Sequence, residues 1–157
     1  MISYEKVRQS LKTLNILIIV LNAILVVFSV FGLISLSLIM NNDHLISQIG
    51  ADQAAVLEQA VTPFSLFISI IAIALMIAII VYTVINQSKI KKVLEVSYLP
   101  YYLGFGLCAV NIISTLLTAP NIVGIVIQLL FLTLYYFAFK KAKTLNEKEH
   151  SKIIEDI

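Results

Sequence analysis

Residues 96–139 read VSYLPYYLGFGLCAVNIISTLLTAPNIVGIVIQLLFLTLYYFAF and contain no charged side chain. The run is about twice as long as the roughly 20 apolar residues that one helical crossing of a bilayer needs. Lysine clusters flank it at 89–92 and at 140–143. Because Lys and Arg concentrate on one side of a membrane, both ends of the run should face the same compartment. The sequence therefore predicts a hairpin of two helices, at about 98–118 and 122–139.

The turn of this hairpin is predicted at Thr118-Ala119-Pro120-Asn121. Pro120 lacks the N–H that would continue a helix, and Asn121 tolerates a tight turn. A re-entrant hairpin that stops halfway across the bilayer is the alternative.

Two further uncharged runs, Leu14–Met40 and Pro63–Ser88, are each long enough for one span, at about 14–40 and 63–87. The first exceeds the roughly 7–15 apolar residues of a cleaved signal peptide, so we expect it to be retained. The chain is 60% hydrophobic and only 13% charged, whereas globular proteins average about 25% charged residues. We therefore predict an all-α integral membrane protein, a four-transmembrane-helix bundle occupying residues 14–139.

All eleven basic residues lie on one side of these spans, and the loop at 41–62 has none. They are Lys6, Arg8, Lys12, Lys89, Lys91, Lys92, Lys140, Lys141, Lys143, Lys148 and Lys152. The positive-inside rule predicts that the N and C termini are cytoplasmic. Lysine supplies all but one of these cations and tryptophan is absent, a usage that favours a multi-pass protein of a bacterial cytoplasmic membrane.

The segments outside the spans are short. Residues 1–13 predict an amphipathic cytoplasmic lead-in helix at the membrane interface, with a partner-binding helix as the alternative. Residues 140–157 form a charged cytoplasmic tail that can continue the fourth span as a helix. The outer loop carries Asp43, Asp52 and Glu58, and its second half predicts a short helix capped by Asp52, before Thr62-Pro63 starts the second span.

Polar side chains inside the spans are the candidate functional residues. Asn15, Asn22 and Ser29 are seven residues apart and share one helical face, with Gly32 one turn further on. Asn111 and Gln128 lie near the middle of their spans, where hydrogen bonds to each other or to Asn22 would satisfy them. We interpret these residues as helix-packing contacts. A polar path for a small solute is the alternative.

Tyrosines and lysines should mark the cytoplasmic boundary. All seven tyrosines lie near it and predict an aromatic belt, with a gate at Tyr101-Tyr102 and Tyr135-Tyr136 as the alternative. The clusters that we expect to anchor the chain to anionic lipid contain Lys89, Lys91, Lys92, Lys140, Lys141 and Lys143. No nucleic-acid partner is expected, because the chain has no soluble basic domain.

No span contains an ionisable Asp, Glu, His, Lys or Arg, which proton-coupled transporters and intramembrane enzymes need. His44 and His150 fall on opposite sides, so we expect no metal, no cofactor and no catalysis. Cys108 is expected to fill apolar space. The favoured function is an accessory, scaffold or regulatory subunit, with a membrane-protein partner or a homo-oligomer. The alternatives are a carrier for a neutral solute, or an immunity or sensor protein whose acidic loop meets a cationic peptide.

Overall fold

The computed structural model describes residues 4–118 and 121–155, and within these ranges it is helical without strands. The helices are α1 (Tyr4–Met40), α2 (Asp43–Ile49), α3 (Ala51–Ala60), α4 (Pro63–Lys91), α5 (Leu99–Thr118) and α6 (Ile122–Glu155). Four of these, α1, α4, α5 and α6, are long and apolar enough to cross a membrane. The predicted all-helical architecture with four long apolar helices is confirmed.

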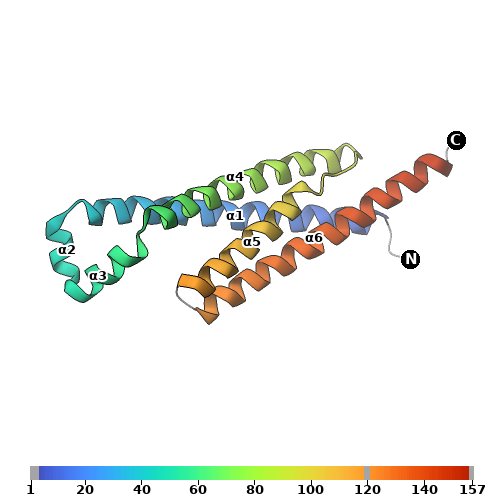
Figure 1. Ribbon diagram of the computed structural model, residues 1–157. Coiled ribbons are helices and arrows are strands. Elements are labelled where there is room, and N and C mark those ends of the chain that lie inside the picture. The colour runs from blue at the N-terminus through green and yellow to red at the C-terminus, as the bar shows by residue number, and fades with distance from the viewer. Residues whose placement is uncertain (1–3, 119–120, 156–157) are drawn as a thin grey trace.

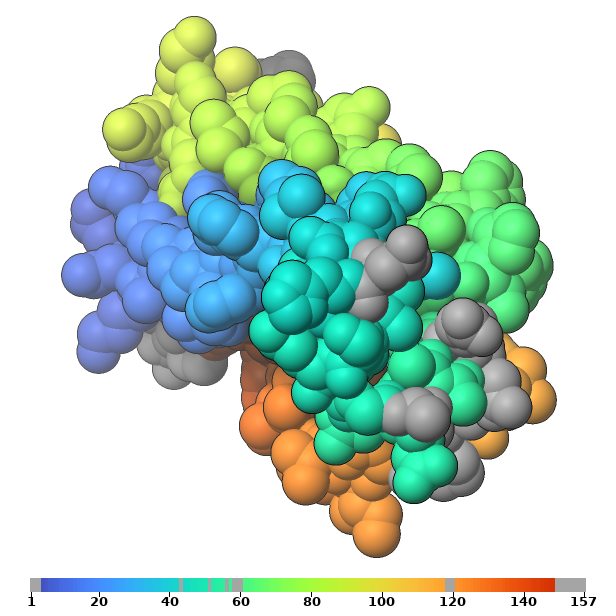
Figure 2. Space-filling view, turned by 90° about the vertical axis from the view of Figure 1, so that its left-hand side faces the viewer, coloured from blue at the N-terminus to red at the C-terminus, as the bar shows by residue number. Residues whose placement is uncertain are grey.

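The four long helices form two antiparallel hairpins, α1–α4 and α5–α6 (Figure 1). Helix α1 packs against α4 and α6, and α5 also packs against both α4 and α6. The start of α1, the α4–α5 linker and the final turns of α6 gather at one end, which we call the lysine end (Figure 1). Helices α2 and α3 lie at the opposite end and project in front of the bundle when it is viewed from there (Figure 2).

Local sequence explains where the helices begin. Thr62 is the N-cap of α4 and Pro63 its first residue, as the Thr-Pro pair predicts, and Ser65 completes a capping box with Thr62. Asn121 accepts hydrogen bonds from the N–H groups of Val123 and Gly124 (3.0 and 3.3 Å) and so caps α6. The other predicted turn residues, Ala119 and Pro120, lie outside the described residues.

The predicted outer helix is present as α3, and α2 precedes it as a further short helix. Asp52 is not its cap, contrary to the prediction. Gly50 takes that position with φ 81°, a conformation that glycine adopts without steric cost. The N-cap therefore lies before Ala51, and Asp52 falls in the first turn of the helix.

Helix α4 ends in a Schellman motif with an unusual residue at its turn. Leu94 N–H donates to Lys89 C=O (2.9 Å), and Val93 N–H donates to Ile90 C=O (3.4 Å). The residue between helix and linker adopts the left-handed conformation that such motifs usually assign to glycine. Here it is Val93, at φ 58°, so a β-branched side chain occupies a strained backbone position.

The tightly packed core lies in the lysine half of the bundle. No described residue of α1 after Asn22 is buried, and none of α4 before Met76 is buried. In the other direction the core extends to Val7 and Leu11 of α1, Val96 of the linker, and Ala142 and Leu145 of α6. The apolar face of the predicted lead-in segment is therefore covered by protein, within a continuous α1.

Candidate functional site: a buried amide network

Asn15 and Tyr101 join α1 to α5 inside the bundle. Both side chains are fully buried. The Tyr101 hydroxyl donates to Asn15 Oδ1 at 2.9 Å, and the Asn86 side chain also reaches the Tyr101 hydroxyl. The contact pairs Asn15 Oδ1, whereas Asn15 Nδ2 is buried without a hydrogen-bond partner among the described residues. An unpaired phenol here would be costly, so this contact favours one register between the two helices.

Asn22 and Tyr135 form the equivalent contact between α1 and α6. Asn22 Nδ2 lies 2.8 Å and Oδ1 lies 3.2 Å from the Tyr135 hydroxyl. Nδ2 also donates to the Ile18 carbonyl of its own helix (2.8 Å). Gly104 of α5 makes room for this tyrosine, because a Cβ at that position would lie 2.5 Å from the Tyr135 ring. Helix α5 thus packs closely against the Tyr135 ring at Gly104.

These two tyrosines correct the predicted belt. Tyr101 and Tyr135 are 0% and 1% exposed, whereas Tyr102 and Tyr136 are 54% and 52% exposed. Consecutive residues point about 100° apart on a helix with 3.6 residues per turn. Each Tyr-Tyr pair therefore supplies one ring to the core and one to the surface, so the belt assignment is wrong for Tyr101 and Tyr135.

Two further asparagines hold the α4–α5 linker. Asn86 of α4 exchanges hydrogen bonds with the backbone of Ser97 (2.7 and 2.9 Å). Asn146 of α6 does the same with the backbone of Val96, with both distances 3.0 Å. The backbone groups of Val96 and Ser97 are thereby satisfied without a strand partner. Sequence reasoning missed both residues, since Asn86 lies at the end of an uncharged run and Asn146 in the charged tail, and neither is part of a distinguishing pattern.

Arg8 and Gln87 connect α1 to α4 at the lysine end. Arg8 Nε donates to Ile90 C=O (2.8 Å), and its Nη2 donates to Lys91 C=O (3.1 Å). Gln87 Nε2 donates to Lys12 C=O (2.7 Å). A cation on the final carbonyls of a helix offsets the negative end of its dipole. Sequence analysis used Arg8 only as a topology signal and missed this cap.

Asn111 and Gln128 bond to each other as expected, since Asn111 Nδ2 lies 3.4 Å from Gln128 Oε1 and links α5 to α6. Ser29 is half-buried. Gly32 is exposed, and a Cβ there would meet no atom within 4 Å. The polar face of α1 therefore contacts other helices at Asn15 and Asn22 but opens beyond them.

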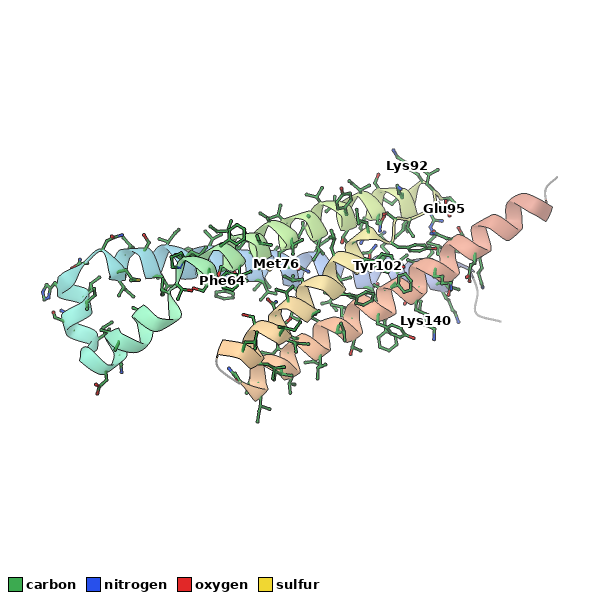
Figure 3. All side chains as sticks on the ribbon, viewed as in Figure 1. Phe64, Met76, Lys92, Glu95, Tyr102 and Lys140 are labelled. Atoms are coloured by element: carbon green, nitrogen blue, oxygen red, sulfur yellow. The ribbon has the colours of Figure 1, made fainter. Side chains whose placement is uncertain are left out.

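The charged candidates lie at the surface. Lys92 of the linker and Lys140 of α6 lie toward the same end of the molecule (Figure 3). Lys91, Lys92, Lys140 and Lys143 are exposed, and Lys89 and Lys141 are half-exposed. Lys143 lies 3.9 Å from Glu147, on side chains about 60% exposed, where an ion pair contributes little.

The acidic candidates of the outer loop are only partly described. Asp52 is exposed, whereas the side chains of Asp43 and Glu58 lie outside the described residues. No group of three or more His, Cys, Asp or Glu among the described residues could hold a metal ion. Cys108 is buried without a disulfide partner.

The network consists of amides, phenols and backbone groups, which exchange hydrogen bonds and hold helices in register. No protein-family model, curated protein or solved structure matches this sequence.

Proposed function

We propose that this chain is a multi-pass membrane protein without catalytic activity that acts as an accessory or scaffold subunit. It would pack against a larger membrane complex or against a second copy of itself. The observation that supports this most is the contrast between the two halves of the bundle. Most of the amide and phenol contacts lie in the lysine half, whereas no described residue of α1 after Asn22 or of α4 before Met76 is buried.

The uncovered surface has the composition of a helix-packing face. Phe28 and Phe31 of α1 are 69% and 65% exposed, and Phe64 and Phe67 of α4 are 73% and 59% exposed. Ser29 and Gly32 lie among them on α1, and small residues let another helix approach closely. Lipid tails would also cover an apolar surface, so the oligomeric state decides whether protein or lipid covers this face.

A solute path has less support. Its candidate lining residues Asn15, Asn22 and Asn111 each hydrogen-bond to another helix of this chain. A polar path needs side chains that are free to exchange partners with its solute. The same residues serve the scaffold proposal, because they stabilise the surface that would be presented.

The test measures the molecular mass of the full chain in mild detergent and in lipid nanodiscs, by light scattering at several protein concentrations. We expect a homo-oligomer, or a stoichiometric partner that copurifies from the native membrane. Gly32→Leu should weaken that association by filling the open face. Gly106→Leu is the matched control, because a Cβ at Gly106 also meets no atom within 4 Å but on α5. A monomer in both environments without a copurifying protein would contradict the proposal.

We also propose that the lysine end faces the cytoplasm of a bacterial cell and that α2 and α3 face the outside. The support is the distribution of the eleven basic residues, which cross a membrane poorly.

A further inference from the structure

The lysine end contains a pocket of about 310 Å³ between α1 and α4. Its lining residues are Glu5, Arg8, Gln9, Lys12, Ile90 and Lys91. The wall comes from the first three turns of α1 and the last turn of α4, two segments that are far apart in the sequence. Arg8 joins the two helices of this wall, because its guanidinium donates hydrogen bonds to the carbonyls of Ile90 and Lys91 at 2.8 and 3.1 Å.

The pocket is positively charged. Arg8, Lys12 and Lys91 are cations and Glu5 is the anion among its lining residues, which leaves a formal charge of +2 at neutral pH. The carbonyl end of α4 would repel an anion by itself. Arg8 is bound to that end and offsets it, so Lys12 and Lys91, opposed by the Glu5 carboxylate, determine the potential at the pocket mouth.

The pocket also lies at the edge of the uncharged helices. Lys12 is the last cation before the uncharged part of α1, and Lys91 follows the uncharged run of α4 by three residues. If these helices cross a bilayer, as proposed above, this edge is the level of the lipid headgroups. Anionic headgroups attract Lys and Arg at that level.

We propose that this pocket binds a phosphate group, supplied by the headgroup of an anionic phospholipid, between the ammonium groups of Lys12 and Lys91. The proposal differs from general attraction to a charged membrane, because it assigns the phosphate to two named lysines. The other basic residues of the lysine end contribute only to the surface potential.

The test compares two charge-matched double variants of the full chain by native mass spectrometry, with phosphatidylglycerol or phosphatidylcholine titrated in mild detergent. Lys12→Gln with Lys91→Gln removes the pocket lysines and leaves Arg8 in place. Lys140→Gln with Lys141→Gln removes the same charge from α6, outside the pocket. We expect phosphatidylglycerol to bind the pocket variant at least about 25-fold more weakly than the wild type, since each charge-assisted hydrogen bond from an ammonium group to the phosphate contributes roughly fivefold or more. The α6 variant, which loses no such contact, should change little.

The proposal would be overturned if both variants lost the same affinity for phosphatidylglycerol. It would also be overturned if the wild type bound the two lipids equally. Inorganic phosphate at millimolar concentration is the second arm. Phosphate that displaces the lipid from the wild type, but not from the Lys12→Gln, Lys91→Gln variant, would support the phosphate site. It would also show that free phosphate can occupy the site in place of a lipid headgroup. Helix content by circular dichroism verifies that both variants are folded. The readout does not depend on oligomeric state, so it can fail separately from the scaffold proposal.

Discussion

Asn22 and Tyr135 provide a direct measure of what the buried network contributes. Tyr135→Phe keeps the ring against Gly104 and removes the hydroxyl from the Asn22 amide. We expect the free energy of unfolding to fall by about 1–2 kcal/mol, because a buried polar group loses a partner. Titration with sodium dodecyl sulfate in mixed micelles measures this change.

Tyr136→Phe is the matched control, because it removes the same atom from a half-exposed side chain next in the sequence. Combining Asn22→Leu with Tyr135→Phe should lower the free energy of unfolding by less than the sum of the two single changes. In the double variant neither partner is left in place without the other. A loss for Tyr135→Phe no larger than for Tyr136→Phe would contradict a stabilising role for this bond.

Gly104 allows a second test at the same site. Gly104→Ala places a Cβ 2.5 Å from the Tyr135 ring, so the ring or α5 must move. We expect a loss of about 1–3 kcal/mol in stability, as is typical of overpacking. Gly106→Ala adds the same methyl group where nothing lies within 4 Å, and it should be neutral or stabilise the helix by up to about 1 kcal/mol. Similar effects of the two substitutions would contradict close packing at Gly104.

Residue types predicted only part of this site. The seven-residue spacing gave Asn15 and Asn22 a shared face, and both are buried. Their tyrosine partners could not be predicted, because an aromatic ring near a lysine cluster also fits a membrane-interface belt. Which ring of each Tyr-Tyr pair points inward depends on helix rotation, and a single sequence does not specify rotation.

At the scale of elements, the α4–α5 connection combines strain with strong anchoring. Val93 adopts φ 58° although its side chain is 51% exposed, so packing does not compensate for the conformation. Val93→Gly should therefore raise the free energy of unfolding by about 1 kcal/mol, the usual steric cost of the left-handed region for other residues. Unfolding titrations of the purified chain measure it.

Leu94→Gly is the control for that substitution, because Leu94 is equally exposed at 51% and adjoins Val93 in the same turn. Its backbone needs no positive φ, so glycine there should destabilise by increasing the freedom of the unfolded chain. A loss of stability in both variants would contradict the assignment of strain to Val93.

Helix positions were more predictable than their connections. Uncharged runs predict how many long helices the chain forms, and lysine clusters predict which helix ends lie together. Both predictions follow from where residue types fall along the chain. The clamps by Asn86 and Asn146 join residues that are 11 and 50 positions from their partners. Such contacts depend on how the two hairpins pack, and no local pattern encodes that packing.

At the scale of the whole molecule, the arrangement of the lysine end predicts that the α4–α5 linker and the end of α6 face the same side of a membrane. The α4–α5 linker and the last turns of α6 lie at one end, and α3 lies at the other (Figure 1). With Cys108→Ala as background, single cysteines at Lys92→Cys, Glu147→Cys and Gln53→Cys place exposed thiols on these three segments.

A membrane-impermeant maleimide added to intact cells should label Gln53→Cys only. Inverted vesicles should give the reverse pattern, with Lys92→Cys and Glu147→Cys labelled together. The physical reason is that the two lysine-rich segments cannot be separated without moving charges through hydrocarbon. Labelling of positions 92 and 147 from different sides would refute the α5–α6 hairpin as a pair of complete spans.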